Sequence, residues 1–424
     1  MQKYVVIFIF TTTLIACSSA RYAPFQKNLQ TRLEDPFYDS QFVGLLVYDP
    51  INQDTLYQKN AQKYFTPASN TKIFTLYTAL TLLPEKLPSL KYFLASDTLF
   101  IEGTGDPTLL HPYFKDSTVI HFLKGRKEPI TYLLPRIPIA HFGSGWAWED
   151  YDSYYAPERS AFPMYGNVVQ IAKSDSLIVT PNYFKDKIVP VANKKNRDLH
   201  HNVFYVDPSR NDTLYVPFMV NDTVTKNLLD YVLQKKIAFG TQSTNPQKTI
   251  IYSVPTDTVL KHMMLESDNF LAEQLLLVAS STLSDTLDVY TAQQHVLQNH
   301  LGDLTEVPRW VDGSGLSRYN LFSPGSMVHV LARLYKEIPH HRLFNLFPVG
   351  GVSGTLKNWN DFNSEPYLFA KSGSLGNTYC LSGYLITKSG KTLVFSFMNN
   401  HYKTPTVEIK ARMQDILHSI RDGN

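Results

Sequence analysis

The chain has 424 residues, enough for one large core or for two to three domains of ordinary size. Hydrophobic residues make up 43% and charged residues 18%, a balance typical of folded proteins that excludes disorder of the whole chain. The net charge is +3, from 40 basic and 37 acidic residues without any lysine or arginine block, so no nucleic-acid partner is expected. Two cysteines cannot build a disulfide framework or a cysteine-ligated metal site.

The N-terminus has the pattern of an export signal. Lys3 precedes the apolar run Tyr4 to Ala16, which is too short to span a bilayer as a mature helix. The run ends in Leu14-Ile15-Ala16-Cys17, which resembles the lipobox of bacterial lipoproteins. The resemblance implies removal of residues 1–16 and a lipid anchor on Cys17, with residues 17–30 as a tether. An ordinary signal peptide before an incidental cysteine is the alternative.

The next elements are predicted to be two strands followed by a helix. Phe42 to Asp49 reads as a buried strand, and a turn and a second short strand follow. Thr66 is a suitable N-cap and Pro67 suits the first helical position, so we expect a helix to begin there. From about residue 93 to 245 the sequence changes to short strand-like runs separated by turns.

The C-terminal part again shows clear helix and strand patterns, as the N-terminal part does. Helical periodicity runs from Val259 to Leu283, and Leu381 to Thr387 with Thr392 to Asn399 predicts a hairpin turning through Ser389-Gly390. A last amphipathic helix would carry the apolar residues Val407, Ile409, Met413, Ile416 and Leu417. We therefore predict one domain, residues 31–92 and 246–424, interrupted by an insertion at 93–245, which the sequence does not resolve into one domain or two. Cys380 lies in an apolar stretch and is expected to be a small buried residue.

The first chemical motif is Ser69-Asn70-Thr71-Lys72. Residues three apart share a helix face, so the hydroxyl of Ser69 and the amine of Lys72 can meet. The positive end of the helix dipole favours negative charge on the serine oxygen and disfavours an ammonium, which helps Lys72 act as a neutral base. Alone, the motif is weak, because Ser-x-x-Lys occurs often by chance and is usually an exposed first helical turn.

Two further motifs follow. In Ser267-Asp268-Asn269 the serine can relay a proton and the asparagine amide can bind a carbonyl and hold the lysine, although all three residues are also good N-caps. In Lys371-Ser372-Gly373-Ser374 the cation can receive a substrate carboxylate, the hydroxyls add hydrogen bonds, and the glycine allows close backbone approach. A solvated strand start is the alternative for this third motif.

In this order the three motifs resemble the signature of penicillin-binding proteins and class A β-lactamases. The long separation of Ser69 from Ser267 resembles the D-alanyl-D-alanine carboxypeptidase/endopeptidase family of low-molecular-mass class C penicillin-binding proteins (peptidase family S13, penicillin-binding protein 4-like), which carries an insertion there. Other stretches that resemble this family are Val311 to Arg318, Gly350 to Leu356, Leu381 to Tyr384, Gly103 to Pro107 and Gly145 to Asp150.

The resemblance implies an α+β fold, in which a β-lactamase/transpeptidase-like catalytic domain, an antiparallel sheet flanked by helices, is interrupted by a β-rich insertion. It implies Ser69 as the acylated nucleophile, Lys72 as its base, and an oxyanion hole formed by the backbone N–H groups of Ser69 and Ser374. Ser267, Asn269 and Lys371 complete the catalytic set, and Ser372, Gly373 and Ser374 bind substrate. Ser372 stands where the family usually has threonine, which keeps the hydroxyl and loses a methyl group.

The resemblance further implies cleavage of peptidoglycan stem peptides through an acyl-enzyme, with β-lactams as covalent inhibitors and with neither cofactor nor metal. A periplasm-facing lipoprotein of the bacterial cell envelope is expected. Asp150 lies where the family places a carboxylate that binds the free amine of the peptide side chain, and a solvated loop acid is the alternative reading.

Two other functions are weighed against this prediction. A β-lactamase on the same fold would need a Glu-x-x-Leu-Asn stretch between Ser267 and Lys371, which is missing. A non-catalytic penicillin-binding scaffold is disfavoured by three intact motifs. The adjacent pairs His200-His201 and His340-His341 lack metal-ligand spacing, and surface or core roles are expected for them. The sequence leaves open whether a terminal D-Ala or a crosslink is cleaved.

Overall fold

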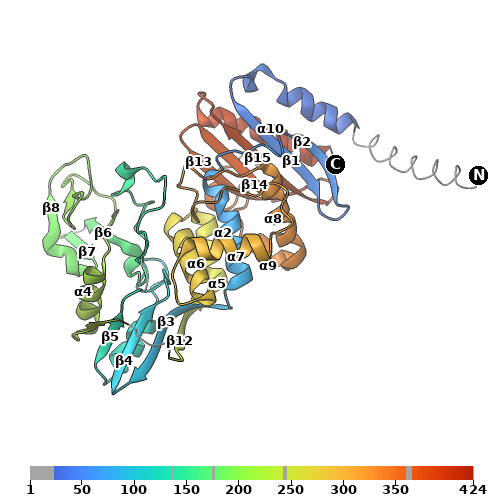
Figure 1. Ribbon diagram of the computed structural model, residues 1–424. Helices are drawn as coiled ribbons and strands as arrows, with labels where there is room; N and C mark the ends of the chain where they lie inside the picture. The colour runs from blue at the N-terminus through green and yellow to red at the C-terminus, as the bar shows by residue number, and fades with distance from the viewer. Residues whose placement is uncertain (1–22, 136–137, 174–176, 242–245, 360–364, 424) are drawn as a thin grey trace, which may run out of the picture. The chain divides into compact units, whose positions relative to one another are not determined.

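The computed structural model describes residues 23–135, 138–173, 177–241, 246–359 and 365–423 (Figure 1). The chain divides into two compact units. The first comprises Met1–Asn70, Leu304–Pro308 and Leu321–Asn424, and the second comprises Thr71–Asp303 and Arg309–Asn320. The chain thus passes from the first unit to the second between Asn70 and Thr71, inside the first sequence motif.

A five-stranded antiparallel sheet with the order β13-β14-β15-β1-β2 is the centre of the first unit. The N-terminal strand β1 pairs directly with the C-terminal strand β15, so segments from both ends of the chain form one sheet. Strands β14 and β15 are buried along nearly their whole length, as expected for a sheet covered on both faces. The strands are β1 (Phe42–Asp49), β2 (Asp54–Lys59), β13 (Leu368–Leu375), β14 (Thr378–Ile386) and β15 (Thr392–Asn400).

Helices cover this sheet. Helix α8 (Pro324–Glu337) contacts β1, β14 and β15, and α10 (Thr406–Asp422) contacts β14. The side chains of Phe395 and Phe397 share a core cluster with those of Ile409 and Met413 on α10. The predicted hairpin and last helix are confirmed, except that Val407 is 71% exposed and does not belong to the apolar face. Short helical segments complete the unit: η1 (Pro36–Tyr38), α9 (His340–Asn345) and η6 (Gly354–Leu356).

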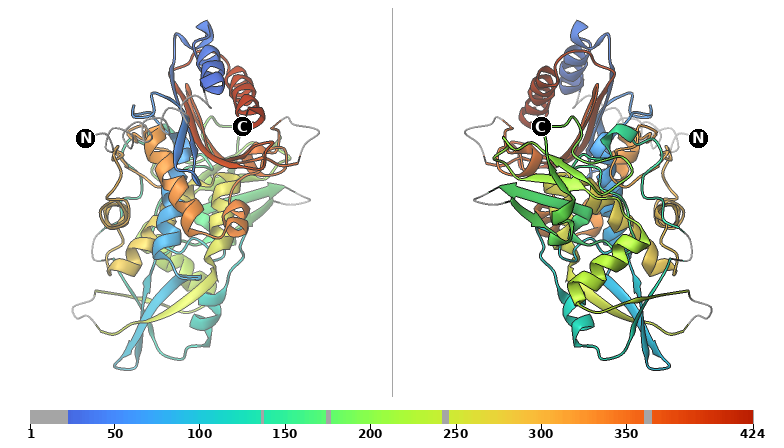
Figure 2. Two further views of the ribbon diagram at one scale, coloured as in Figure 1. Left: turned by 90° about the vertical axis from the view of Figure 1, so that its right-hand side faces the viewer. Right: turned by 90° about the vertical axis from the view of Figure 1, so that its left-hand side faces the viewer.

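Residues 23–33 form a helix that lies beside α10 (Figure 2), where the sequence predicted a tether up to residue 30. Leu29 and Leu33, four residues apart and therefore on one helix face, are buried in the same cluster as α10. Burial of this face favours a docked helix over a solvated tether. The predicted signal segment 1–16 and Cys17 lie outside the described residues. Among the residues that are described, no helix is both long enough and apolar enough to cross a membrane.

The helical part of the second unit is built around α6 (Asn269–Leu283), which is buried over most of its length. It contacts α2 (Lys72–Leu82), α5 (Thr256–Glu266) and α7 (Val289–Asn299). The sequence predicted continuous helical periodicity from Val259 to Leu283, but the helix is broken at Ser267, which has the left-handed φ of 57°. Asp268 then caps α6, its Oδ1 accepting from the backbone N–H of Leu271 at 2.9 Å.

The inserted region contains three small sheets around one core. Their orders are β11-β5-β4-β3-β12, β10-β6-β7 and β8-β9. A single cluster of buried residues, including Ile101, Val169, Phe204 and Leu228, joins residues of these sheets and of the helices α3 and α4. The elements are β3 (Lys86–Ala95), β4 (Thr98–Gly103), α3 (Thr118–Gly125), β5 (Ile130–Leu133), β6 (Val168–Lys173), β7 (Leu177–Thr180), β8 (Ile188–Pro190), β9 (Phe204–Val206), β10 (Leu214–Pro217), α4 (Asp222–Leu233), β11 (Ala238–Gly240) and β12 (Thr249–Pro255), with the short helices η3 (Trp148–Asp150), η4 (Tyr165–Asn167) and η5 (Asn182–Lys187).

The compact units do not coincide with the predicted domain ranges 31–92, 93–245 and 246–424. Helices α2, α5, α6 and α7 fall in the same unit as the insertion, because α6 is hydrogen-bonded to it. The side-chain amide of Gln274 donates to the backbone carbonyls of Gly105 and Ser160, at 2.7 and 2.9 Å. Lys91 of β3, the strand that pairs with β4 of the insertion, donates to the carbonyl of Ser281 at 2.7 Å. Hydrogen bonds between segments that lie so far apart along the chain cannot be predicted from the local pattern of the sequence.

Candidate active site

The turn that carries Ser69 belongs to the first unit. It is a 3-10 segment, η2 (Ala68–Thr71), that runs directly into α2, so the helix begins later than predicted. Thr66 is not its cap, because the helical turn begins only at Ala68 and Thr71 occupies the N-cap position of α2; the backbone N–H of Thr66 donates to Asn400 Oδ1 at 2.7 Å. Ala68 is fully buried with a left-handed φ of 48°, which places the rare backbone conformation directly before the half-buried Ser69.

The first and third motifs are joined by direct contacts within that unit. The side-chain amide of Asn70 donates to the backbone carbonyls of Lys371 and Cys380, at 2.9 and 3.3 Å. At Gly373 a Cβ would lie 2.5 Å from the Pro67 oxygen and 2.9 Å from the backbone nitrogen of Ser69. Only glycine therefore lets β13 approach the Ser69 turn this closely.

The side chains of the third motif differ in exposure. Lys371 is fully buried and its Nζ donates to the carbonyl of Ser372 at 2.7 Å. The hydroxyl of Ser372 donates to Thr355 Oγ1 at 2.7 Å, whereas Ser374 is exposed. Cys380, which pairs with Gly373 across the sheet, is fully buried, and burial raises the pKa of its thiol to about 12. The prediction of a small buried residue at Cys380 is confirmed.

Lys72, on the first turn of α2, belongs to the second unit and is fully buried. Its Nζ donates to Asn269 Oδ1 at 2.6 Å and to the carbonyl of Ser314 at 2.7 Å. Burial lowers the pKa of Lys72 from 10.5 to about 8, against the opposing charges of Asp312, Asp268 and Glu273. A substantial fraction of this amine is neutral near pH 8, as a proton acceptor requires.

In the second motif one residue caps a helix and the other two remain available to the site. Asp268 caps α6, which leaves Ser267 half-buried at the break between α5 and α6. Asn269 uses both ends of its amide: Oδ1 accepts from Lys72 and Nδ2 donates to the carbonyl of Tyr155 at 2.9 Å. This orientation of the amide suits both contacts, because Oδ1 accepts from the lysine and Nδ2 donates to the carbonyl.

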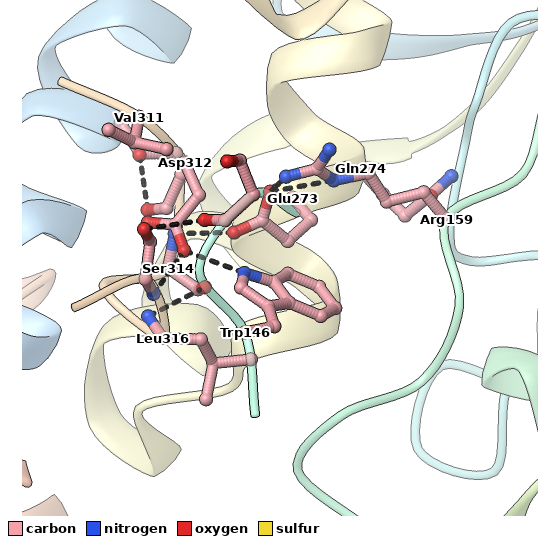
Figure 3. A network of polar contacts seen from close by, with 12 residues as sticks. Trp146, Arg159, Glu273, Gln274, Val311, Asp312, Ser314 and Leu316 are labelled. Carbon is pink, nitrogen blue, oxygen red and sulfur yellow. Dashed lines mark hydrogen bonds and ion pairs between the residues drawn. The ribbon is translucent and has the colours of Figure 1, made fainter. Parts of the chain in front are cut away.

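Figure 3 shows a polar network that the sequence did not single out. Glu273 of α6 forms a buried ion pair with Arg159 of the inserted region, with Nη2 and Oε2 2.6 Å apart. Asp312 is fully buried and accepts from Trp146 Nε1 at 2.8 Å. Burial raises the pKa of the Asp312 carboxyl, and the charge of Glu273 adds to that rise. Asp312 was predicted only as part of a family-like stretch, while Arg159 and Glu273 carry no local pattern.

Asp150 lies in the second unit at the end of η3 and is half-buried. Its Oδ1 accepts from the hydroxyl of Tyr155 at 2.8 Å. It lines a small pocket together with Phe142, Trp146, Ala147, Tyr151, Ala156 and Leu316. Among the described residues, no group of three or more His, Cys, Asp or Glu side chains is placed to hold a metal ion.

The chain matches the D-Ala-D-Ala carboxypeptidase 3 (S13) family over residues 25–183 and 221–420. It therefore belongs to that family. The match covers the three motifs, both sides of the insertion and part of the insertion itself.

Individual proteins similar to this chain include named carboxypeptidases. The chain is 23% identical over 435 residues to "Penicillin-sensitive carboxypeptidase A" of Dictyostelium discoideum, covering 86% of this chain and 83% of that protein. It is 30% identical over 177 residues to "D-alanyl-D-alanine carboxypeptidase DacB" of Haemophilus influenzae, covering 40% of this chain and 37% of that one. The fold is similar to penicillin-binding protein 4 (dacB) from H. influenzae, with a TM-score of 0.72 at 20% identity over 93% of this chain and 98% of that chain.

These findings confirm three predictions. The family resemblance is correct, the fold is the α+β fold of a penicillin-binding protein, and the chain is an enzyme of the D-Ala-D-Ala carboxypeptidase class rather than a β-lactamase or a scaffold.

Gly373→Ala is expected to slow acylation by a penicillin about 100-fold, because the new methyl group must displace either β13 or the Ser69 turn. The measurement is the second-order acylation rate of the full-length protein in detergent. Gly125→Ala is the matched control, since a Cβ there meets nothing within 4 Å. An unchanged rate in Gly373→Ala would show that the close approach of β13 is not needed for acylation.

Proposed function

We propose that this chain cleaves peptidoglycan stem peptides ending in D-Ala-D-Ala through an acyl-enzyme on Ser69, with Lys72 as the base. The observation that carries the assignment is the state of Lys72: a fully buried amine, bonded to Asn269 and to the Ser314 carbonyl, with its pKa lowered to about 8. Ser69 precedes it by one helical turn in a continuous helical segment.

The acylation step follows from these roles. Neutral Lys72 takes the proton of the Ser69 hydroxyl as Oγ attacks the carbonyl carbon of the penultimate D-Ala. The backbone N–H groups of Ser69 and Ser374 stabilise the oxyanion of the tetrahedral intermediate. The carbon–nitrogen bond then breaks, the leaving amine of the terminal D-Ala takes a proton relayed through Ser267, and an ester remains on Ser69.

Deacylation completes the cycle. A water molecule adds to the ester carbonyl, the bond to Ser69 Oγ breaks, and the serine regains its proton. A β-lactam reacts by the same first step, but its leaving amine stays attached to the acyl group, so a longer-lived adduct is expected. The structural relative from H. influenzae has also been solved as a complex with a β-lactam, at a TM-score of 0.64 and 18% identity.

Lys371 and Ser372 are assigned to the substrate carboxylate. A buried cation on β13 next to a hydroxyl suits a C-terminal carboxylate, which supports this role. The hydroxyl of Ser372 already bonds Thr355, so its orientation is set before substrate binds. The lost methyl group of the family's threonine changes the fit of the substrate more than the chemistry.

Acylation of Ser69 is tested by intact-protein mass spectrometry of the full-length chain after addition of a penicillin. The wild type should gain one penicillin mass and Ser69→Ala none, while Cys380→Ala, the control for a thiol adduct, should behave as the wild type. Absence of any adduct on the wild type would support a non-catalytic scaffold. Hydrolysed penicillin without a lasting adduct would mean a β-lactamase.

Asp150 is proposed to bind the free amine of the stem-peptide side chain. Asp150→Ala should then raise KM about tenfold for a peptide that carries this amine and leave KM unchanged for the same peptide with the amine acetylated. The neighbouring exposed acid serves as the control, as Glu149→Ala should change neither value. Equal KM values for wild type and Asp150→Ala with the free-amine peptide would remove Asp150 from the site.

We further propose that the protein is a periplasm-facing lipoprotein of a bacterial envelope, processed before Cys17. The lipobox-like Leu14-Ile15-Ala16-Cys17 supports this. Mass spectrometry of the N-terminal peptide from the membrane fraction should find acylated Cys17 as the first residue, and Cys17→Ala should release the protein from that fraction. An unmodified Cys17 peptide would contradict the proposal.

A further inference from the structure

Arg159 and Glu273 form an ion pair that is withdrawn from solvent. Their side chains are 7% and 1% exposed, and both Nε and Nη2 of Arg159 donate to Glu273 Oε2, at 2.9 and 2.6 Å. Arg159 comes from the inserted region and Glu273 from α6, the helix that also carries Asn269 (Figure 3). Burying two charges is expensive, so a pair in this position needs a reason beyond stability.

The second carboxylate oxygen of Glu273 points to the backbone that holds Lys72. Its Oε1 accepts from the N–H of Ser314 at 2.7 Å, and the carbonyl of the same residue accepts from Lys72 Nζ. The ion pair thus fixes Glu273, Glu273 fixes Ser314, and Ser314 fixes the amine of Lys72.

Asp312 holds the next peptide unit, the one that carries the Ser314 carbonyl. The N–H of Gly315 donates to Asp312 Oδ1 at 2.8 Å, so the peptide unit between Ser314 and Gly315 is aligned between the Asp312 carboxyl and the Lys72 amine. Asp312 Oδ2 is itself held by Trp146 of the inserted region. The ring of Trp146 also lies against Arg159, whose guanidinium carbon is 5.2 Å from the ring centroid.

We propose that Arg159 and Glu273 are a positioning pair for Lys72, through which the inserted region orients the amine and balances the charge around it. This role rests on the proposed function of Lys72 as the base. Neither residue touches the reacting atoms in the proposed mechanism. The guanidinium offsets the carboxylate that holds Ser314, so the backbone is fixed without adding a net negative charge beside the amine.

The charges around Lys72 within its unit give the direction of the effect. The carboxyl groups of Asp312, Asp268 and Glu273 each raise the pKa of Lys72, against the larger lowering by burial. Asp268 in turn faces His262 of α5 and His111, and burial lowers the pKa of both histidines. The other titratable groups on the helices that contact α2 are Asp257, Lys261 and Glu266 on α5 and Tyr290 and His295 on α7.

Glu273→Gln is the decisive variant, since glutamine keeps an acceptor for the Ser314 N–H but removes the charge and leaves Arg159 as an unbalanced cation. The acylation rate of full-length protein by a penicillin is measured from pH 6 to 10. For the wild type the rate should rise with pH through a midpoint near 8, where Lys72 loses its proton. For Glu273→Gln the midpoint should fall by about one pH unit, because an uncompensated cation disfavours the ammonium.

Two further variants separate charge balance from simple damage. Arg159→Met with Glu273→Gln removes both charges, and its midpoint should return most of the way to the wild-type value. Arg159→Lys keeps a cation and should leave the midpoint in place while lowering the rate. Thermal melting identifies any variant that does not fold, and the double variant, which has no unpaired charge, keeps the test decisive if Glu273→Gln is unstable.

Glu158→Gln is the matched control, because Glu158 is also a buried partner of an arginine, Arg197 at 3.5 Å, and also accepts a backbone N–H, that of Val220. Its loss should lower stability without moving the midpoint. Lower rates in all variants with one common midpoint would overturn the positioning pair and leave the proposed function intact. A wild-type rate that does not depend on pH near 8 would instead remove Lys72 as the base.

Discussion

The site depends on keeping one lysine amine out of water. Lys72 is fully buried, and this desolvation outweighs three neighbouring carboxyl groups and brings the pKa down to about 8. A buried amine must still be hydrogen-bonded, and here the partners are a side-chain amide, Asn269, and a backbone carbonyl, that of Ser314. Both are neutral, so they orient the amine without the pull toward the ammonium form that a carboxylate partner would exert. The surrounding carboxyl groups of Asp312, Asp268 and Glu273 raise the pKa through their charge alone, without bonding the amine.

The need to hold the partners of the buried Lys72 amine in place explains why the second unit joins helix α6 to the insertion. The Ser314 backbone is held by Glu273 and Asp312, and both of these carboxyl groups are bonded by residues of the inserted region, Arg159 and Trp146. Removing one partner of a buried ion pair typically costs about 3–5 kcal/mol. The insertion therefore helps to hold the residues around Lys72, in addition to any role that it has in selecting peptides.

Local signals in the sequence predicted the elements that local physics determines. The strand Phe42 to Asp49 and the hairpin of β14 and β15 follow from apolar runs and a glycine turn, and both are present. The three motifs were found because their spacing is local and their order along the chain is distinctive. Tertiary contacts override local preference elsewhere. The backbone of Thr66 is bonded to Asn400 and the helical turn begins only at Ala68, and Ser267 adopts a left-handed conformation within a helical pattern. The Arg159–Glu273 pair joins residues more than a hundred positions apart, and no pattern in one sequence reveals such a partner.

The burial of Cys380 has a practical consequence for spectroscopy. With its thiol fully buried and its pKa raised to about 12, only about one molecule in ten thousand carries the thiolate at pH 8, and none of it faces a reagent. The only other cysteine in the chain is Cys17, whose sulfur would be blocked by acylation in the lipoprotein. Two cysteines introduced at exposed positions would then be the sites open to maleimide dyes or spin labels, so the distance between them could be measured on the catalytically intact enzyme without first removing its native thiols.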